Sequence, residues 1–422
     1  MSGGRARLVV VVLPATLYFF SYFHRVAPAV VAADIMRAFG ISGASLALLA
    51  AVYPYVFAVM ALIAGSLADG VGPRLTLTGG GVAMAFGTAL FGLAPSFGVA
   101  VAGRLLMAVG ASVILIAWLS LIAAWLRADE FATAAGWTQT VGNVGGLAAS
   151  LPLALLVEAA GWRETFVLIG GVTLVLALVV LALVHDRPRG AVAPRERASV
   201  GTVLSGMRAV VANRRSWPPV LAAAGMFATV VTLQGLWGVA WLTQVYGFGR
   251  VSASSMIALL GLGVGIGAPL AGFISDRWQR RRGTFVLFSV AYAAGWLVLA
   301  TGGDGRLGSD WLAPFLLLMG VAAGGLALVF ACVREVNDPA RVGLSIGFCN
   351  MPIFFGFGLV QLVSGLVLDA RWEGLAAQGA RIYPPSAYRA LFALCLAIAV
   401  ASSLAAALVS ETRGRTVTRD SR

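Results

Sequence analysis

Long apolar runs dominate this sequence and constrain its fold more than any other feature. Runs of about 18 or more mostly apolar residues recur along the whole chain, and each is long enough to cross a bilayer as one helix. Hydrophobic residues make up 60% of the 422 residues and charged residues only 11%, against about 25% charged in a typical soluble domain. The sequence therefore predicts an all-α membrane protein.

Twelve transmembrane helices are predicted, in two sets of six. Their approximate ranges are 8–31, 45–68, 75–93, 97–125, 132–157, 164–184, 217–244, 254–274, 284–301, 312–333, 342–368 and 386–409. The one long polar connection separates the two sets. The predicted organisation is an N-terminal six-helix bundle (1–184), a cytoplasmic linker (185–216) and a C-terminal six-helix bundle (217–422).

The arginines cluster in every second loop between the predicted spans. The net charge is +13, and the chain has arginine but no lysine. With both termini in the cytoplasm, 21 arginines lie on the cytoplasmic side, seven lie outside, and Arg25 and Arg104 lie within spans. This excess follows the positive-inside rule and predicts a multi-pass protein of the inner (cytoplasmic) membrane with both termini cytoplasmic. The same placement argues against nucleic acid as a partner.

A ten-residue stretch occurs twice, at an offset of 207 residues. The first copy, 65–74, is GSLADGVGPR, and the second, 272–281, is GFISDRWQRR. The same offset pairs Arg127 with Arg334 and Asn143 with Asn350. The chain is therefore predicted to consist of two pseudo-symmetric halves of the same topology, related by an axis along the membrane normal.

Both copies resemble the loop 2–3 motif of the major facilitator superfamily, G-x-L-x-D-x-x-G-x-R. The second copy departs from it, with Gln279 where the later glycine would fall. The stretch 104–111 resembles the helix 4 motif R-x-x-x-G-x-G-A, with Ala108 in place of a glycine. The resemblance covers the whole chain and implies transport by alternating access. It also implies gating roles for Gly65, Asp69, Gly72, Arg74, Arg104, Gly272, Asp276 and Arg281.

Within the superfamily, the chain resembles the organophosphate and organic-anion permeases. This resemblance depends on Arg25 in helix 1, on the run 334–339 (REVNDP) before helix 11, and on the segment 234–238 (QGLWG) in helix 7. The 207-residue offset places Thr232 opposite Arg25, so the second arginine of a phosphate clamp is missing. The resemblance implies an organic anion rather than a sugar phosphate.

Helix 1 carries the strongest candidate for substrate binding, Arg25. An arginine within a span costs about 2.5–3.5 kcal/mol on insertion scales, so such residues usually have a function. Tyr18, Tyr22 and Arg25 share one helix face, which suits an anion or an aromatic solute. The alternatives are an arginine that extends to the membrane interface and a packed aromatic stripe. His24 is either a proton carrier or a histidine packed between helices.

Other candidates lie on helices 4, 5, 7 and 11. On helix 4, Trp118 shares a face with Arg104. On helix 7, three residues are predicted to share a face and to contact the substrate: Gln234, Trp237 and Trp241. Asn143 and Asn350 occupy equivalent places in the two halves and either bind substrate or join helices by hydrogen bonds.

All 17 acidic residues lie in loops or at span ends. This disfavours a cationic drug as substrate, because exporters of cations generally need a buried carboxylate. The sequence contains no Walker motif, metal-ligand cluster or paired intramembrane carboxylates, so an enzyme is not expected and neither is a cofactor.

We therefore expect a secondary transporter for a small organic anion or zwitterion, such as a carboxylate, an amino acid or a sugar derivative. A drug or metabolite exporter of the same fold is the main alternative, and a membrane receptor is a more distant one. The expected partners are the solute, the lipid bilayer and a proton as a candidate coupling ion (symport). The protein is expected to be a monomer.

Overall fold

The computed structural model describes residues 3–60, 63–187, 200–302, 308–338 and 342–417. Contacts between helices divide the chain into two compact units. Unit 1 comprises Met1–Val31 and Val52–Arg197, and unit 2 comprises Ala32–Ala51 and Ala198–Arg422. The segment that contains most of α2 and the first half of α3 therefore packs with the C-terminal part of the chain.

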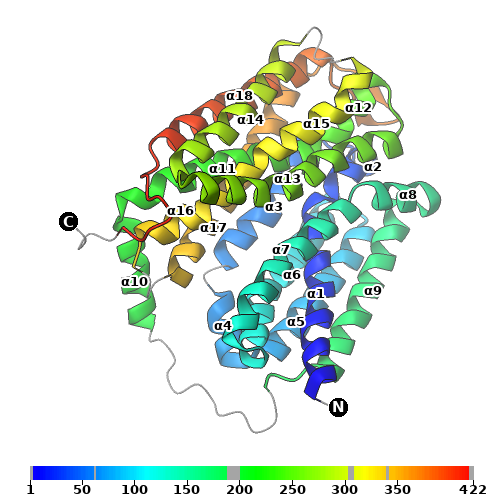
Figure 1. Ribbon diagram of the computed structural model, residues 1–422. Helices are drawn as coiled ribbons and strands as arrows, with labels where there is room; N and C mark the ends of the chain where they lie inside the picture. Colours follow the sequence, from blue (N-terminus) through cyan, green and yellow to red (C-terminus); the bar gives the residue numbers. More distant parts are fainter. Residues whose placement is uncertain (1–2, 61–62, 188–199, 303–307, 339–341, 418–422) are drawn as a thin grey trace. The chain divides into compact units, whose positions relative to one another are not determined.

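The first half of the sequence forms nine helices among the described residues (Figure 1). They are α1 (Gly3–Val26), α2 (Pro28–Phe39), α3 (Gly43–Met60), α4 (Ala64–Val71), α5 (Pro73–Gly92), α6 (Phe97–Trp125), α7 (Ala128–Ala148), α8 (Leu151–Ala160) and α9 (Trp162–Leu183).

The second half contains nine further α-helices, three short helical turns and one small hairpin among the described residues. The helices are α10 (Val200–Ala212), α11 (Trp217–Thr232), α12 (Gly238–Tyr246), α13 (Arg250–Trp278), α14 (Arg281–Thr301), α15 (Ser309–Ala323), α16 (Leu328–Val336), α17 (Val342–Asp369) and α18 (Pro385–Ala407). The turns are η1 (Arg214–Ser216), η2 (Leu233–Trp237) and η4 (Gly324–Ala327), and the strands are β1 (Ala376–Ala377) and β2 (Ala380–Arg381).

The twelve predicted membrane spans are confirmed: twelve helical segments among the described residues are long and apolar enough to cross a bilayer. Several are interrupted where the sequence analysis expected continuous helices. The first helix ends at Val26, just before Pro28, whose ring and missing N–H prevent the helix from continuing regularly. A break at Ala149 and Ser150 precedes Pro152 and divides the fifth span into α7 and α8.

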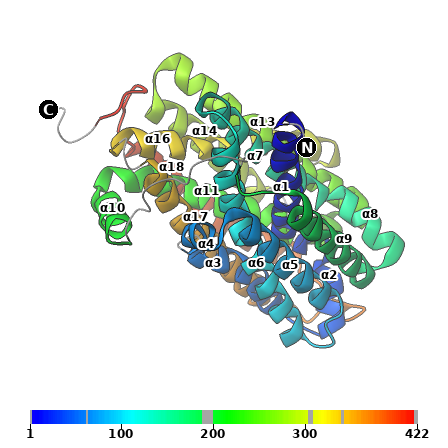
Figure 2. The same ribbon diagram turned by 90° about the horizontal axis from the view of Figure 1, so that it is seen from below.

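Glycines allow helices within each unit to approach closely. In unit 1, α5 packs against both α6 and α9 (Figures 1 and 2). A Cβ at Gly87 of α5 would lie 2.3 Å from the backbone nitrogen of Met107 on α6, so only glycine fits. In unit 2, Gly263 of α13 has the same role against Leu317 of α15. Such close packing stabilises helix pairs in lipid, where apolar side chains gain little by associating.

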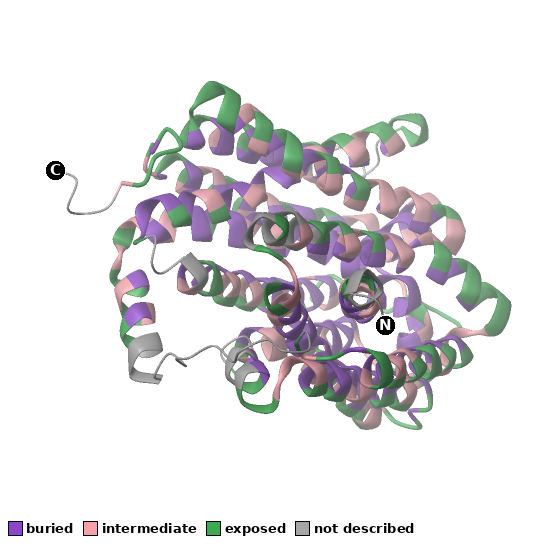
Figure 3. Cartoon of the chain, turned by 60° about the horizontal axis from the view of Figure 1, so that its bottom comes forward, coloured by how far each residue is buried: buried purple, intermediate pink, exposed green. Residues whose placement is uncertain are grey.

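Most helices have a buried side and an exposed side (Figure 3). The exposed sides carry large apolar residues, as Phe86 of α5 and Phe273 of α13 illustrate, with 57% and 68% of their surface accessible. Apolar surface of this kind is expected where lipid, rather than water, surrounds the helices.

Two local features were not predicted from sequence. The expected linker 185–216 contains the helix α10, and its residues 188–199 lie outside the described part of the chain. After α17, β1 and β2 form an antiparallel hairpin around Gln378 and Gly379. Both turn residues have positive φ angles, 51° and 86°, as a two-residue hairpin turn requires.

The carboxylate of Asp369, at the end of α17, caps the start of α3. Its oxygens accept hydrogen bonds from the backbone N–H groups of Gly43 (3.0 Å) and Ala44 (2.8 Å). They also accept from Tyr383 Oη (2.7 Å) and Arg381 Nη1 (3.1 Å). Burial and the bond to Asp369 raise the pKa of the Tyr383 phenol, so this hydroxyl remains a donor. Four donors therefore compensate one carboxylate, which also interacts favourably with the positive end of the helix dipole.

We predict that Asp369→Ala lowers the stability of the protein. The variant leaves two N–H groups at the start of α3 without their acceptor, which should cost about 2 kcal/mol. Thermal unfolding of the protein in detergent measures the change. Glu373→Ala is the matched control, because Glu373 is an exposed acid only four residues away. Equal melting temperatures for Asp369→Ala and the wild type would contradict the capping role.

Candidate solute-binding site

Four of the residues predicted to bind substrate lie together in unit 1. The rings of Tyr18 and Tyr22, one turn apart on α1, have centroids 5.3 Å apart. Trp118 of α6 lies against Tyr18, with a centroid distance of 5.7 Å. The guanidinium carbon of Arg25 lies 4.0 Å from the centre of the Tyr22 ring. The tyrosine–arginine face of α1 and the tryptophan of α6 thus form one continuous surface, in which only Tyr22 is more than slightly exposed.

Helix α3 adds two aromatic residues that the sequence analysis missed, Tyr53 and Phe57. Arg25 lies 5.5 Å from the centre of the Phe57 ring, and Arg104 of α6 lies 4.6 Å from that of Tyr53. Tyr53 Oη donates a hydrogen bond to the backbone oxygen of Ser21 and so attaches α3 to α1. The sequence did contain a signal, because these two rings stand four residues apart on one face of an otherwise largely aliphatic helix.

We call this set of seven residues the arginine–aromatic cluster: Tyr18, Tyr22, Arg25, Tyr53, Phe57, Arg104 and Trp118. It contains two cations, and the helices that carry it (α1, α3 and α6) contain no aspartate or glutamate. Both arginines are buried, with 5% and 3% of their surface exposed. Aromatic faces attract guanidinium groups, each contact contributing up to about 2 kcal/mol when desolvated, which offsets part of the cost of burying them.

Arg104 has unused hydrogen-bonding capacity. Its Nη1 donates to the backbone oxygen of His24 (2.6 Å) and lies 3.5 Å from the Met107 sulfur. Its Nε has no hydrogen-bond partner among the described residues, and neither does Nε1 of Trp118. These two donors are therefore available to an acceptor.

His24 lies in the interface between α1 and α5, beside the cluster rather than within it. Its Nε2 is 3.1 Å from Thr88 Oγ1, and Thr88 itself donates to the Met84 backbone oxygen (2.7 Å). The threonine oxygen must therefore accept from Nε2–H, which assigns the tautomer with an unprotonated Nδ1. This geometry favours the helix-packing interpretation of His24 over the proton-carrier one.

In unit 2, the predicted face of helix 7 is interrupted by the π-helical turn η2. Trp237 Nε1 donates to Ser364 Oγ of α17 (2.7 Å), whereas the ring of Trp241 packs on Phe392 of α18 at 5.2 Å. Gln234 is half-buried at the start of the turn. A π turn contains one residue more than an α-helical turn. The α-helical spacing that predicted a shared face therefore does not hold here, and the two tryptophans contact different helices.

The two equivalent asparagines, Asn143 of α7 and Asn350 of α17, are both half-buried. Asn143 follows Gly142, where a Cβ would lie 2.9 Å from the ring of Tyr22. Helix α7 therefore packs directly against the arginine–aromatic cluster next to this asparagine.

The repeated stretch makes different contacts in its two copies. Arg74 Nε donates to the backbone oxygen of Leu181 (2.9 Å). Arg281 instead forms ion pairs with Glu335 (Nη2 to Oε1, 2.8 Å) and with Asp276. Gly72 has a φ angle of 98° and makes the tight turn from α4 to α5, as expected. For Gly272, a Cβ would meet no described atom within 4 Å.

The surroundings of Gly65 and the side chain of Asp69 lie outside the described part of the chain, so the predicted contacts of the first motif aspartate are not among those described. Of the predicted gating set, the structure thus describes Arg74, Asp276 and Arg281 in polar contacts. It places Arg104 in the arginine–aromatic cluster, against the ring of Tyr53.

Each half also has an acidic cap that the sequence analysis missed. The backbone N–H of Arg74, at the start of α5, donates to Asp186, which follows α9 (2.7 Å). The backbone N–H of Arg281, at the start of α14, donates to Glu411, which follows α18 (2.8 Å). In both halves, an acid beyond the sixth span therefore caps the third span. The two acids are not at the 207-residue offset, so the repeat did not reveal them.

Of the run 334–339, which suggested the organic-anion branch, the structure describes residues 334–338, and these connect helices of unit 2. Glu335 pairs with Arg281, and Asn337 Nδ2 donates to Ser216 Oγ (2.8 Å). Asn213 Nδ2 donates to Asn337 Oδ1 at 3.0 Å. These contacts explain Glu335 and Asn337 without a substrate.

With this geometry known, the comparisons with known proteins decide the family. The family model of the Major Facilitator Superfamily matches residues 15–255 and 234–421. This chain belongs to the major facilitator superfamily. The superfamily assignment agrees with both motifs and with the twelve spans. No curated protein matches the chain.

Solved structures of superfamily transporters share this fold. A bacterial homologue of the human lysosomal transporter Spinster, in an inward-facing and unoccupied conformation, is 20% identical and covers 97% of both chains, with a TM-score of 0.77. The D-xylose–proton symporter is 15% identical over 97% of this chain and 99% of that one (TM-score 0.74). The nucleoside transporter NupG is 15% identical over 94% and 98% (TM-score 0.73). At these identities the likeness shows the fold alone.

We predict that Asp186→Ala and Glu411→Ala each lower the unfolding free energy by about 1 kcal/mol, the usual effect of losing a helix cap. The two effects should be similar, since each acid caps the third span of its own half. Thermal unfolding of the two variants and of the control Glu158→Ala, an exposed acid at the end of α8, measures them. A loss in Glu158→Ala as large as in the other two would show that acid removal alone, rather than capping, is responsible.

Proposed function

We propose that this protein is a secondary transporter for a small organic anion or zwitterion that carries a carboxylate. The superfamily and its solved members support transport of small solutes. The observation that supports an anion is the arginine–aromatic cluster, in which two buried guanidinium groups, on α1 and α6, lie among helices that contain no acidic residue.

The electrostatics of the cluster favour an anionic ligand. Each intramembrane arginine costs about 2.5–3.5 kcal/mol on insertion scales, and the aromatic faces offset only part of this. An anion at the cluster would compensate the remaining positive charge. A carboxylate also matches a guanidinium in shape, because two parallel N–H···O bonds can form. Nε of Arg104 offers a donor for such a bond.

The aromatic side chains favour an organic ligand over an inorganic ion. Tyr18, Tyr22, Phe57 and Trp118 supply flat apolar surface around the charged groups, and Trp118 Nε1 adds a hydrogen-bond donor. Ligand sites typically combine such apolar walls with a few placed polar groups. A carboxylate attached to an apolar or aromatic body fits this combination, as the resemblance to organic-anion permeases also suggests.

The remaining elements of the proposal come from the sequence. Two six-helix bundles (1–184 and 217–422), joined by a cytoplasmic linker, would alternate access to the site, with both termini cytoplasmic. Gln234 and Asn350 of the second bundle and Asn143 of the first, all half-buried, stay proposed as substrate-binding residues, whereas the contacts of His24, Trp237 and Trp241 favour packing between helices. We propose that the protein is a monomer, and uptake into proteoliposomes driven by a pH gradient would establish a proton as the coupling ion.

Export of a drug or metabolite is the alternative function. The same fold can serve import and export. The unpartnered donors of the arginine–aromatic cluster, Arg104 Nε and Trp118 Nε1, suit an anionic metabolite in either case. Lipophilic cations are the substrates that separate the two proposals, since the cluster repels them. Stabilisation of the protein by tetraphenylphosphonium, unaffected by loss of Arg25, would favour the exporter.

We predict that carboxylates raise the melting temperature of the purified protein and that Arg25→Gln and Arg104→Gln abolish this effect. At a concentration 100 times its dissociation constant, a ligand that binds only the folded state stabilises it by about 2.7 kcal/mol. A thermal-shift screen with benzoate, amino acids, sugars and tetraphenylphosphonium measures the effect, and uptake into proteoliposomes then tests transport.

Arg7→Gln is the matched control for this experiment, because Arg7 is an exposed arginine on the same helix. It should keep the carboxylate response of the wild type. The anion proposal fails if Arg25→Gln and Arg104→Gln transport and bind carboxylates as the wild type does.

We also predict a specific kinetic effect for the first motif aspartate, which by resemblance holds the two halves in one conformation. Asp69→Asn should slow exchange between conformations while leaving ligand affinity nearly unchanged. Thermal shift measures the ligand affinity, and the maximal uptake rate measures the exchange between conformations. Asp186→Ala is the comparison variant, because it removes an acid that caps α5 and is not part of the motif. Normal turnover in Asp69→Asn would refute the gating role.

A further inference from the structure

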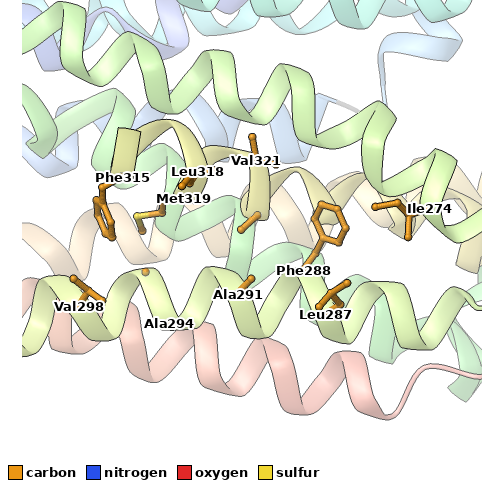
Figure 4. Close-up of a pocket in the computed structure, with 12 residues that line it drawn as sticks. Ile274, Leu287, Phe288, Ala291, Ala294, Val298, Phe315, Leu318, Met319 and Val321 are labelled. Carbon is orange, nitrogen blue, oxygen red and sulfur yellow. The ribbon is translucent and has the colours of Figure 1, made fainter. Parts of the chain in front are cut away.

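An apolar groove runs along the outer surface of unit 2, between α14 and α15, with Ile274 of α13 at one end (Figure 4). Its volume is about 490 Å³. The groove exists because α14 presents small residues, Ala291, Ala294 and Gly295, where the neighbouring turns carry Leu287 and Val298. From α15, Phe315, Leu318 and Met319 form the opposite wall (Figure 4).

The groove opens toward the lipid. Leu318 and Leu287 have 66% and 48% of their surface exposed, and Ala291 and Ala294 are exposed as well. All these residues belong to helices long and apolar enough to span a membrane. Because every side chain of the lining is apolar, water would gain nothing by filling the groove, and only a hydrocarbon chain matches it.

The length of the groove matches one leaflet of a bilayer. Along α14 it extends from Leu287 to Val298, which is about 16 Å at a rise of 1.5 Å per residue. The hydrocarbon of one leaflet is about 15 Å deep, half of a core of about 30 Å. Leu287 lies six residues, about 9 Å, after Arg281 at the start of α14, so a single acyl chain in the groove would lie in the membrane interior, past the polar boundary.

One end of the groove carries positive charge. Ile274 is followed one turn later on α13 by Arg277, and Arg280 lies directly before α14. Both arginines are exposed, and no ion pair among the described residues involves either of them. Arg277 lies three residues from Ile274 and Arg280 lies seven residues from Leu287, so both belong to the helix ends nearest the Ile274 end of the groove. The neighbouring Arg281, in contrast, is buried and paired with Glu335.

We infer that this groove is a binding site for an anionic phospholipid, with one acyl chain between α14 and α15 and the phosphate beside Arg277 and Arg280. Each arginine near an anionic headgroup contributes about fivefold in affinity, so the charged end selects anionic over zwitterionic lipids. The site is separate from the arginine–aromatic cluster and does not depend on the proposed substrate.

The test is native mass spectrometry of the full-length, delipidated protein in detergent, titrated with palmitoyl-oleoyl phosphatidylglycerol or with phosphatidylcholine of the same chains. The wild type should bind phosphatidylglycerol about tenfold more tightly or better. Arg277→Gln with Arg280→Gln should bring the two affinities close together. Arg389→Gln, at an exposed arginine on α18, should leave the preference unchanged.

Ala291→Phe tests the groove itself, because a phenyl ring there fills the space of the chain. Each methylene displaced from an apolar site weakens binding about fourfold, so the affinity for both lipids should fall at least tenfold. Val290→Phe adds the same ring at an adjacent lipid-exposed position outside the groove and should bind as the wild type does. Both positions are exposed, and thermal unfolding without lipid checks that both variants fold.

Equal affinity of the wild type for the two lipids would overturn the role of the arginines. Unchanged binding in Ala291→Phe would overturn the groove as the site. If Ala291→Phe does not fold, the arginine pair still decides the proposal, since its residues are exposed and unpaired among the described residues.

Discussion

Hydrocarbon offers no hydrogen bonds, and this constraint decides where the chain places its charges. Three acids lie at the starts of helices, where backbone N–H groups and the helix dipole compensate them: Asp369 at α3, Asp186 at α5 and Glu411 at α14. The acids thus satisfy the backbone at the ends of spans and leave the middle of the spans free of negative charge.

The buried arginines differ in their partners, and the proposed site depends on this difference. Arg281 has Glu335 and Asp276 as partners, whereas Arg25 and Arg104 lie against aromatic rings on helices without acids. An ion pair fixes a charge permanently, whereas Nε of Arg104, which has no hydrogen-bond partner among the described residues, can be bound by a ligand. A reversible binding site needs the second arrangement.

The sequence predicted the features that follow from periodicity and from the repeat. Twelve spans were found from apolar runs. The helical spacing of Tyr18, Tyr22 and Arg25 correctly predicted that these three side chains lie together. Spacing failed at the π turn before Trp241, since one added residue changes every later direction. Contacts between distant segments, such as Arg104 with Tyr53, could not be predicted, because no local pattern encodes which helices become neighbours.

The cap on α3 also has a consequence for how the protein is made. Gly43 and its acceptor Asp369 are 326 residues apart in the sequence. At a synthesis rate of about 5–20 residues per second, roughly 16 to 65 s pass between the two. During that time α3 must sit in the membrane with only water or headgroups at its first N–H groups. The second span of this protein thus receives its cap only after the eleventh span has been synthesised.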